Sequence, residues 1–146
     1  MTVRAGNLFA DVSAASAGEE AFSEIFAQPG LKIERIISQG QASAPEFWYD
    51  QAWNEWVIVL KGSAILQFED EPATRALGEG DYVFIPARKR HRVEWTDPQQ
   101  PTVWLTVHFE CRLRRWCRRR SNCLCLRQGF PDPRGQYQGL QGSALC

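Results

Sequence analysis

Histidine and cysteine, the residues best suited to bind metals or to act as nucleophiles, are unevenly distributed along this chain. His91 and His108 precede residue 110, and all five cysteines follow it. The cysteines are spaced C-x5-C-x5-C-x-C, without a CxxC pair or a histidine among them, which is poor spacing for structural zinc. We expect them to be free thiols in a reducing cytoplasm. No G-x-S-x-G turn and no glycine loop that could cradle a phosphate is present, which argues against nucleophilic catalysis.

Between residues 31 and 109, short runs of Ile, Val, Trp and Phe alternate with turn signals about every ten residues, which predicts an all-β domain. No helical pattern of ten residues interrupts these runs, so an antiparallel sandwich or barrel is favoured over a parallel βαβ fold. The expected strands are Lys32 to Ser38, Phe47 to Tyr49, Glu55 to Leu60, Ser63 to Glu69, Asp81 to Ile85, His91 to Trp95 and Pro101 to Phe109.

Two segments of this β region resemble the two sequence motifs of the cupin superfamily. The first motif reads G-x5-H-x-H, three or four residues, E, then x6-G, and WYDQAWNEWVIVLKG keeps Glu55 and Gly62. The second reads G-x5-P-x-G-x2-H-x3-N, and GDYVFIPARKRHRVEW keeps Gly80, Pro86 and His91. The resemblance is to small single-domain bacterial cupins and implies a cupin-type antiparallel β-barrel, also called a double-stranded β-helix or jelly roll.

In the family, the two histidines of the first motif, its glutamate and the histidine of the second motif bind a metal inside the barrel. Carried over with a four-residue spacer, the first histidine becomes Trp48 and the second becomes Asp50. The resemblance therefore implies a reduced metal site of Asp50, Glu55 and His91, with open positions for water or substrate. Such an oxygen-rich set suits Fe, Mn, Zn or Ni as a divalent ion. The alternative is that these three residues only shape a turn and a strand, with no cofactor bound.

The same resemblance suggests a ligand pocket, with Trp48, Trp95, Arg88 and Arg90 as its candidate residues. Trp48 would offer a flat face to a ring or a sugar, although packing explains most tryptophans in a domain of this size. Arg88 and Arg90 would guide a carboxylate or phosphate toward the barrel, although such a basic run is more often a solvated cluster. We expect His108 to be a structural histidine. The catalytic residues cannot be named from the sequence.

The two ends of the chain differ from the β region. Apolar residues at helical spacing in residues 14–28, before Pro29-Gly30, predict a short amphipathic helix within an N-terminal arm, residues 1–30. The net charge of zero hides about −7 over residues 1–110 and +7 over residues 111–146, where eight Arg stand beside one acid. This Arg- and Cys-rich tail is expected to be disordered or to derive from a frameshift, and the barrel to span residues 31–110.

Several functions are compatible with these features. The first hypothesis is a divalent-metal-dependent enzyme acting on a small molecule inside the barrel, and the second is a metal-free small-ligand binding or sensing module. We expect a homodimer, because small cupins resemble one another in pairing. No apolar run approaches the length of a membrane helix and no signal peptide is recognisable, so a cytoplasmic protein without a membrane partner is expected. Nucleic acid would bind only nonspecifically, through the Arg-rich tail.

Overall fold

The computed structural model describes residues 2–12 and 19–110 of the chain. The chain divides into two units, residues 1–112 and 113–146, and only the first is described below. The predicted properties of residues 111–146 therefore lie outside the described part. Eight strands follow one another along the first unit: β1 Ala21–Gln28, β2 Leu31–Ser38, β3 Asn54–Lys61, β4 Ala64–Phe68, β5 Arg75–Leu77, β6 Tyr82–Ile85, β7 His91–Thr96 and β8 Thr102–Phe109.

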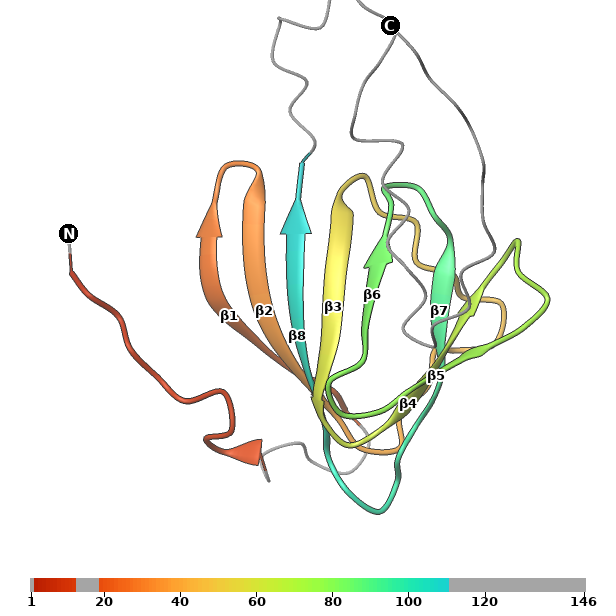
Figure 1. Cartoon of the computed structure of the whole chain (residues 1–146), viewed down its shortest axis with the longest axis horizontal. Helices are drawn as coiled ribbons and strands as arrows, with labels where there is room; N and C mark the ends of the chain where they lie inside the picture. Colours follow the sequence, from red (N-terminus) through yellow and green to blue (C-terminus); the bar gives the residue numbers. More distant parts are fainter. Residues whose placement is uncertain (1, 13–18, 111–146) are drawn as a thin grey trace, which may run out of the picture. The chain divides into compact units, whose positions relative to one another are not determined.

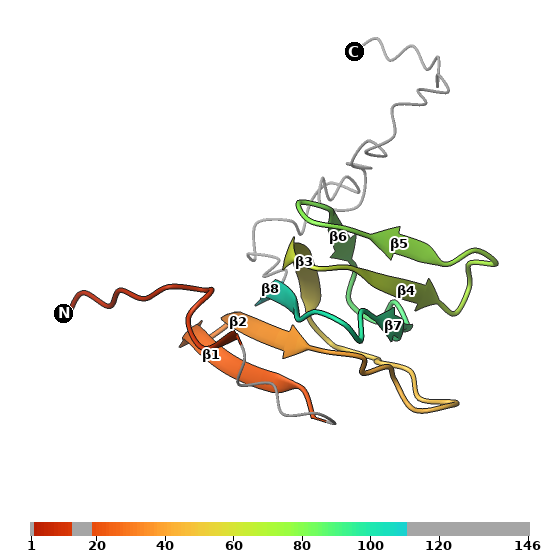
Figure 2. The ribbon, with the colours of Figure 1, turned by 90° about the horizontal axis from the view of Figure 1, so that it is seen from below.

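The strands form two antiparallel sheets. One has five strands in the order β1-β2-β8-β3-β6, and the other has three in the order β5-β4-β7 (Figure 1). Seen after a quarter turn, β4, β5 and β7 form a layer that faces the larger sheet (Figure 2). The predicted all-β, antiparallel jelly roll is confirmed. Within residues 2–12 and 19–110, no helix is long and apolar enough to cross a membrane.

Alternating side chains build the core between the sheets. In β3 the buried positions are Glu55, Val57 and Val59, whereas the residues between them are partly exposed. In β4 the buried positions are the apolar residues at every second place, from Ala64 to Phe68. This period of two places one face of each strand against the opposite sheet, so the apolar face that the sequence displays becomes the core.

The helix predicted over residues 14–28 is wrong where the structure describes it, because residues 21–28 form strand β1. This strand pairs antiparallel with β2 from Ala21 opposite Ile37 to Gln28 opposite Leu31, with a register shift between Glu24 and Phe26. Pro29 and Gly30 close the hairpin, with Gly30 at a positive φ of 83°. Pairing with a neighbouring strand outweighs the local preference of an Ala- and Glu-containing segment for a helix.

Two other strand predictions need adjustment. Residues 47–49 form no named strand, although Tyr49 makes an isolated bridge with His91. The short strand β5 was not expected, since it follows a turn-rich segment and has only three residues. The glycine of the first motif, Gly62, has a φ of +82° in the tight β3–β4 turn, and a Cβ there would lie 2.7 Å from the Pro101 carbonyl oxygen. Only glycine fits that turn without displacing the backbone of the segment before β8.

Candidate small-molecule site

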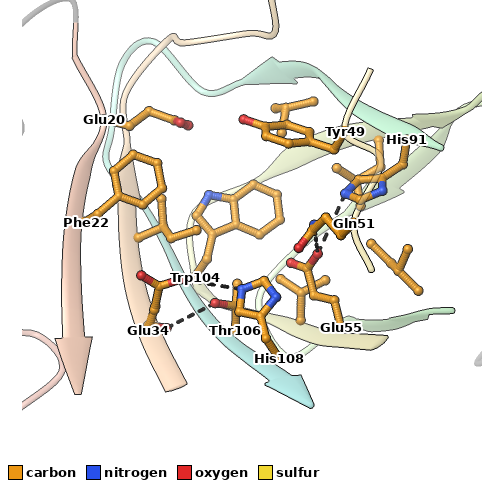
Figure 3. A pocket seen from close by; sticks show the side chains of 15 residues that line it. Glu20, Phe22, Glu34, Tyr49, Gln51, Glu55, His91, Trp104, Thr106 and His108 are labelled. Carbon is orange, nitrogen blue, oxygen red and sulfur yellow. Dashed lines mark hydrogen bonds and ion pairs between the residues drawn. The ribbon is translucent and has the colours of Figure 1, made fainter. Parts of the chain in front are cut away.

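A cavity of about 230 Å³ opens between the two sheets (Figure 3). This volume is below the roughly 300–1,000 Å³ of sites for drug-sized ligands, so the cavity suits a small metabolite. Its wall is apolar in part and carries five titratable side chains besides a tyrosine. The lining residues are Glu20, Phe22, Glu34, Ile36, Tyr49, Gln51, Glu55, Val57, Leu66, Ile85, His91, Val93, Trp104, Thr106 and His108.

The register of the larger sheet explains how these side chains meet. Ile36 of β2 lies opposite Phe22 of β1 and Trp104 of β8, which gives an apolar row across three strands. The next residues on the same face of β8 are polar. Thr106 lies opposite Glu34 of β2, and His108 lies opposite Glu55 of β3. Residues two apart on a strand point to the same face, so the apolar and polar rows line one wall.

Glu55 and His91 form the most buried polar pair of the cavity. His91 Nε2 lies 3.7 Å from Glu55 Oε2, and the side chains are 7% and 9% exposed, respectively. The Gln51 amide donates a 2.7 Å hydrogen bond to the same Glu55 oxygen. Burial raises the pKa of the Glu55 carboxyl and lowers the pKa of the His91 imidazole. Both shifts favour a neutral pair over separated charges.

The orientation of the His91 ring follows from its other nitrogen. Nδ1 lies 3.0 Å from the carbonyl oxygen of Lys89. A carbonyl oxygen can only accept a hydrogen bond, so Nδ1 carries the ring proton and donates a hydrogen bond to the Lys89 carbonyl oxygen. The neutral ring therefore turns an unprotonated Nε2 toward Glu55, where it can accept a proton.

A second carboxylate and imidazole lie beside the first pair. His108 Nε2 is 3.5 Å from Glu34 Oε2, both side chains being 14% exposed. Lys32 pairs with the other Glu34 oxygen at 2.7 Å, so the Glu34 charge is compensated from the strand itself. The sequence predicted a structural role for His108, yet the residue lines the cavity on the same wall as Glu55 (Figure 3).

A third group of polar residues lies around Glu20 and Tyr49. Ser38 donates a 2.7 Å hydrogen bond to Glu20, and the Trp104 indole donates a 3.2 Å hydrogen bond to Ser38. In Figure 3 the Glu20 carboxylate and the Tyr49 hydroxyl point toward one another above the Trp104 ring. Burial and the nearby carboxylates, Glu20 first, raise the pKa of Tyr49. The phenol therefore stays protonated and can donate.

The structure does not bring together the three residues of the predicted metal set. Glu55 and His91 meet in the cavity, but the Asp50 side chain is 48% exposed and pairs with Arg88 at 3.2 Å. The reason is that successive side chains alternate in direction along extended backbone, and the bridge between Tyr49 and His91 holds this segment extended. With Tyr49 and Gln51 directed into the cavity, Trp48 and Asp50 are directed away from it.

The four predicted pocket residues also lie outside the cavity lining. Trp48 packs against two cations, with the guanidinium of Arg92 5.6 Å from its ring centre and that of Arg90 6.0 Å away. Arg90 pairs with Glu69, and Arg88 is 68% exposed. Trp95 on β7 is 39% exposed. These side chains form an outer surface, which agrees with the solvated charge cluster that the sequence analysis left open.

Tyr49 and Gln51 are the site residues that the sequence analysis missed. The first motif allows three or four residues between its second histidine and the glutamate. With three, the two histidine positions fall on Tyr49 and Gln51, which line the cavity, and not on Trp48 and Asp50. The shorter spacer was the signal that could have found them, because it moves the two histidine positions by one residue while Glu55 and Gly62 keep their places.

The side chains present do not fit a bound metal ion. No three His, Cys, Asp or Glu residues gather as a possible ion site in the part of the chain that the structure describes. Glu55 and His91 supply two strong ligands, whereas the other two motif positions hold a phenol and an amide. The Gln51 amide turns its nitrogen, which is a hydrogen-bond donor and no metal ligand, toward Oε2 of Glu55.

The protein is a two-sheet jelly roll that encloses a small cavity lined by both apolar and ionisable side chains. The sequence profile of the cupin domain matches residues 34–108, and the chain belongs to the cupin family. No match was found among curated proteins.

Solved structures of similar fold include one that is also similar in sequence. A protein from Ralstonia eutropha JMP134, provisionally named a mannose-6-phosphate isomerase, is 52% identical, with a TM-score of 0.71, and the match covers 74% of this chain and 99% of that one. A protein of unknown function from Rhizobium leguminosarum bv. viciae 3841 is 22% identical, with a TM-score of 0.56 over 75% of this chain and 98% of that chain. A cupin superfamily protein from Desulfitobacterium hafniense DCB-2 is 16% identical, with a TM-score of 0.54, covering 67% and 85% of the two chains. The last two similarities concern the fold alone.

Proposed function

We propose that this cupin is a metal-independent enzyme that moves a proton within a small molecule held in the barrel. The observation that carries the proposal is the buried Glu55–His91 pair, whose nearest nitrogen and oxygen are 3.7 Å apart. A gap of this length between an acid and a base leaves both able to engage atoms of a ligand. The metal-dependent enzyme considered from the sequence is disfavoured, because Asp50 does not join Glu55 and His91.

The proposed reaction uses the two groups in opposite roles. The unprotonated His91 Nε2 takes a proton from a carbon beside a carbonyl group, and protonated Glu55 gives its proton to the carbonyl oxygen. The product is an enediol. The protonated His91 then gives its proton to the neighbouring carbon while the Glu55 carboxylate takes the proton of the other hydroxyl, which completes an isomerisation. If the proton on His91 first exchanges with solvent and is then returned to the original carbon, as Glu55 recovers its own proton, the C–H hydrogen is exchanged with solvent. The pKa of Glu55, raised by burial, and that of His91, lowered by burial, both favour this starting state.

The relative that is 52% identical gives partial support to this chemistry. Its provisional name is that of an isomerase, and sugar isomerisation is a proton transfer between neighbouring carbons. The phosphate in that name finds less support here, because no Lys or Arg of residues 2–12 and 19–110 belongs to the cavity lining. We therefore propose the proton transfer for this chain without the phosphorylated substrate.

The experiment is hydrogen exchange followed by NMR. Chelator-treated full-length protein is incubated in D2O with dihydroxyacetone, glyceraldehyde and aminoacetone, and loss of the C–H signal next to the carbonyl is timed. We expect exchange in the wild type, and a loss of about 10²- to 10⁴-fold in Glu55→Gln and in His91→Gln, as for other general acids and bases. Asp50→Asn is the matched control, because Asp50 lies outside the cavity, and it should exchange at the wild-type rate.

Three results would overturn the proposal. The first is exchange that persists in both cavity variants, the second is exchange that needs an added metal ion, and the third is no exchange of any of the three compounds above the rate without protein.

One observation also favours the metal-free binding module as a second candidate. The Trp104 ring, which is 4% exposed, belongs to the cavity wall and lies opposite Ile36, so a bound molecule would lie against it. If the protein binds without turnover, a metabolite should quench or shift tryptophan fluorescence in chelator-treated protein, and Trp104→Phe should remove that response.

A further inference from the structure

We infer that the ligand of this cavity is a small organic cation, an ammonium group on a partly apolar body. This inference rests on the proposed function, since it names the chemical class of molecule that the cavity would take. It is carried by the charges and rings of the cavity wall, which differ from those expected for an anionic substrate.

The four Lys or Arg side chains of residues 88–92 lie outside the cavity lining, and each is paired with a carboxylate. Lys89 pairs with Asp70 at 2.6 Å and with Glu71 at 3.3 Å. In the same run Arg88, Arg90 and Arg92 pair with Asp50, Glu69 and Glu94, respectively. None of these cations lines the cavity, so none is available there to bind a phosphate or a carboxylate.

The carboxylates, in contrast, lie on the cavity wall. The charge of Glu34 is compensated by Lys32, and burial raises the pKa of the Glu55 carboxyl, which favours its neutral form. Glu20 makes no ion pair within residues 2–12 and 19–110, and its hydrogen-bond donor is the neutral Ser38 hydroxyl. Among the residues that the structure describes, Glu20 is therefore the carboxylate of the wall that no ion pair balances, which favours a positively charged ligand.

Aromatic rings surround the same end of the cavity. Phe22, Tyr49 and Trp104 line it together with Glu20 (Figure 3). An ammonium group is attracted to the face of such rings, most strongly to tryptophan and away from water. Phe22 is still 60% exposed, so this end is also the one that a ligand can reach from solvent.

Three probes of similar size test the inference by calorimetry on chelator-treated full-length protein: benzylammonium, its near-isostere benzyl alcohol, and benzoate. We expect benzylammonium to bind at least tenfold more tightly than benzyl alcohol, and benzoate not to bind. Glu20→Gln should lower the affinity for benzylammonium to that for benzyl alcohol and leave the affinity for benzyl alcohol unchanged, because the amide oxygen can still accept the hydrogen bond from Ser38. Glu19→Gln is the matched control, because Glu19 is exposed and directly precedes Glu20 in the chain.

The outcomes separate this inference from the proposed function. Equal binding of the ammonium and the alcohol, tight binding of benzoate, or a preference for the ammonium that survives Glu20→Gln would overturn the cation assignment. The first of these would leave the proton-transfer proposal standing, since a neutral ligand would then occupy the cavity. Failure of all three probes to bind would count against both.

Discussion

Tyr49 and His91 exchange two backbone hydrogen bonds, with N–O distances of 2.8 and 3.3 Å, although they lie in segments separated by four strands. This bridge holds the segment before β3 in extended backbone and decides which of its side chains enter the cavity. Tyr49 and Gln51 enter it, and Asp50 between them does not.

Replacing Gln51 and Asp50 separately by alanine tests which of the two side chains enters the cavity. Gln51→Ala removes the donor to Glu55, so we expect the exchange rate measured by NMR to fall at least tenfold. The lost partner of a buried carboxylate should also cost about 1–3 kcal/mol of unfolding free energy. Asp50→Ala removes only an exposed ion pair and should change neither quantity measurably. A larger effect from Asp50→Ala than from Gln51→Ala would contradict the bridge-based register.

The pH dependence of stability should reveal the buried state of His91. Its folded pKa is lowered from 6.5 by burial, so the unfolded chain takes up this proton at a higher pH than the folded protein. The free energy of unfolding should therefore fall as the pH drops below about 6.5 and on through the lower folded pKa. Glu55, with its raised pKa, opposes this trend, because its folded form takes up a proton first.

Chemical denaturation between pH 7.5 and 5.5 in a Glu55→Gln background isolates the histidine. Stability should decline across this range, and the decline should be shallower once His91→Gln is added. Identical slopes in the two variants would mean that His91 titrates as it does in the unfolded chain.

Arg88 offers a test of backbone strain in the second motif. It has a φ of +67°, and it stands where the family motif has glycine. A left-handed conformation costs a residue with a Cβ roughly 1–2 kcal/mol. Glycine avoids this cost but loses more conformational entropy on folding, which offsets part of the gain. Arg88→Gly should therefore raise the free energy of unfolding by roughly 1 kcal/mol, seen as a higher melting temperature. Arg88→Ala, which loses the same ion pair but keeps the strain, should show no such gain.

The outer edge of β1 is where we expect two copies of the chain to associate. β1 is the edge strand of the larger sheet, and its Ile25 and Phe26 are 43% and 38% exposed. Exposed apolar edge strands pair readily with other chains. Ile25→Lys should convert a dimer to a monomer in light scattering, whereas Tyr82→Lys, on the opposite edge strand β6, should not. A monomer mass for the wild type at micromolar concentration would rule out the expected dimer.

The strands of the β region could be predicted because their alternation directly reflects burial between two sheets. The turns could be predicted because Gly and Pro mark them, as at Gly62. The strand over residues 21–28 was not predicted, because its apolar residues have helical spacing and its pairing with β2 is not contained in local propensity.

The site was predictable only in its two most distinctive residues. Glu55 and His91 follow from the motif positions, whereas Tyr49 and Gln51 depend on a spacer that the motif leaves variable. A shift of one residue in an extended segment exchanges inward and outward side chains, which is why Trp48 and Asp50 both lie outside the cavity lining. His108 and Glu34 are 74 residues apart in the chain, and only the β2–β8 pairing brings them side by side.

Metal content is the most direct test of the claim that this cupin works without an ion. Protein purified without chelators would be analysed for transition metals, and its melting temperature measured with added Fe, Mn, Zn and Ni. We predict well under one equivalent of any metal and no shift in melting temperature, because Glu55 and His91 supply only two strong ligands. One equivalent of metal that disappears in both Glu55→Gln and His91→Gln would contradict the account.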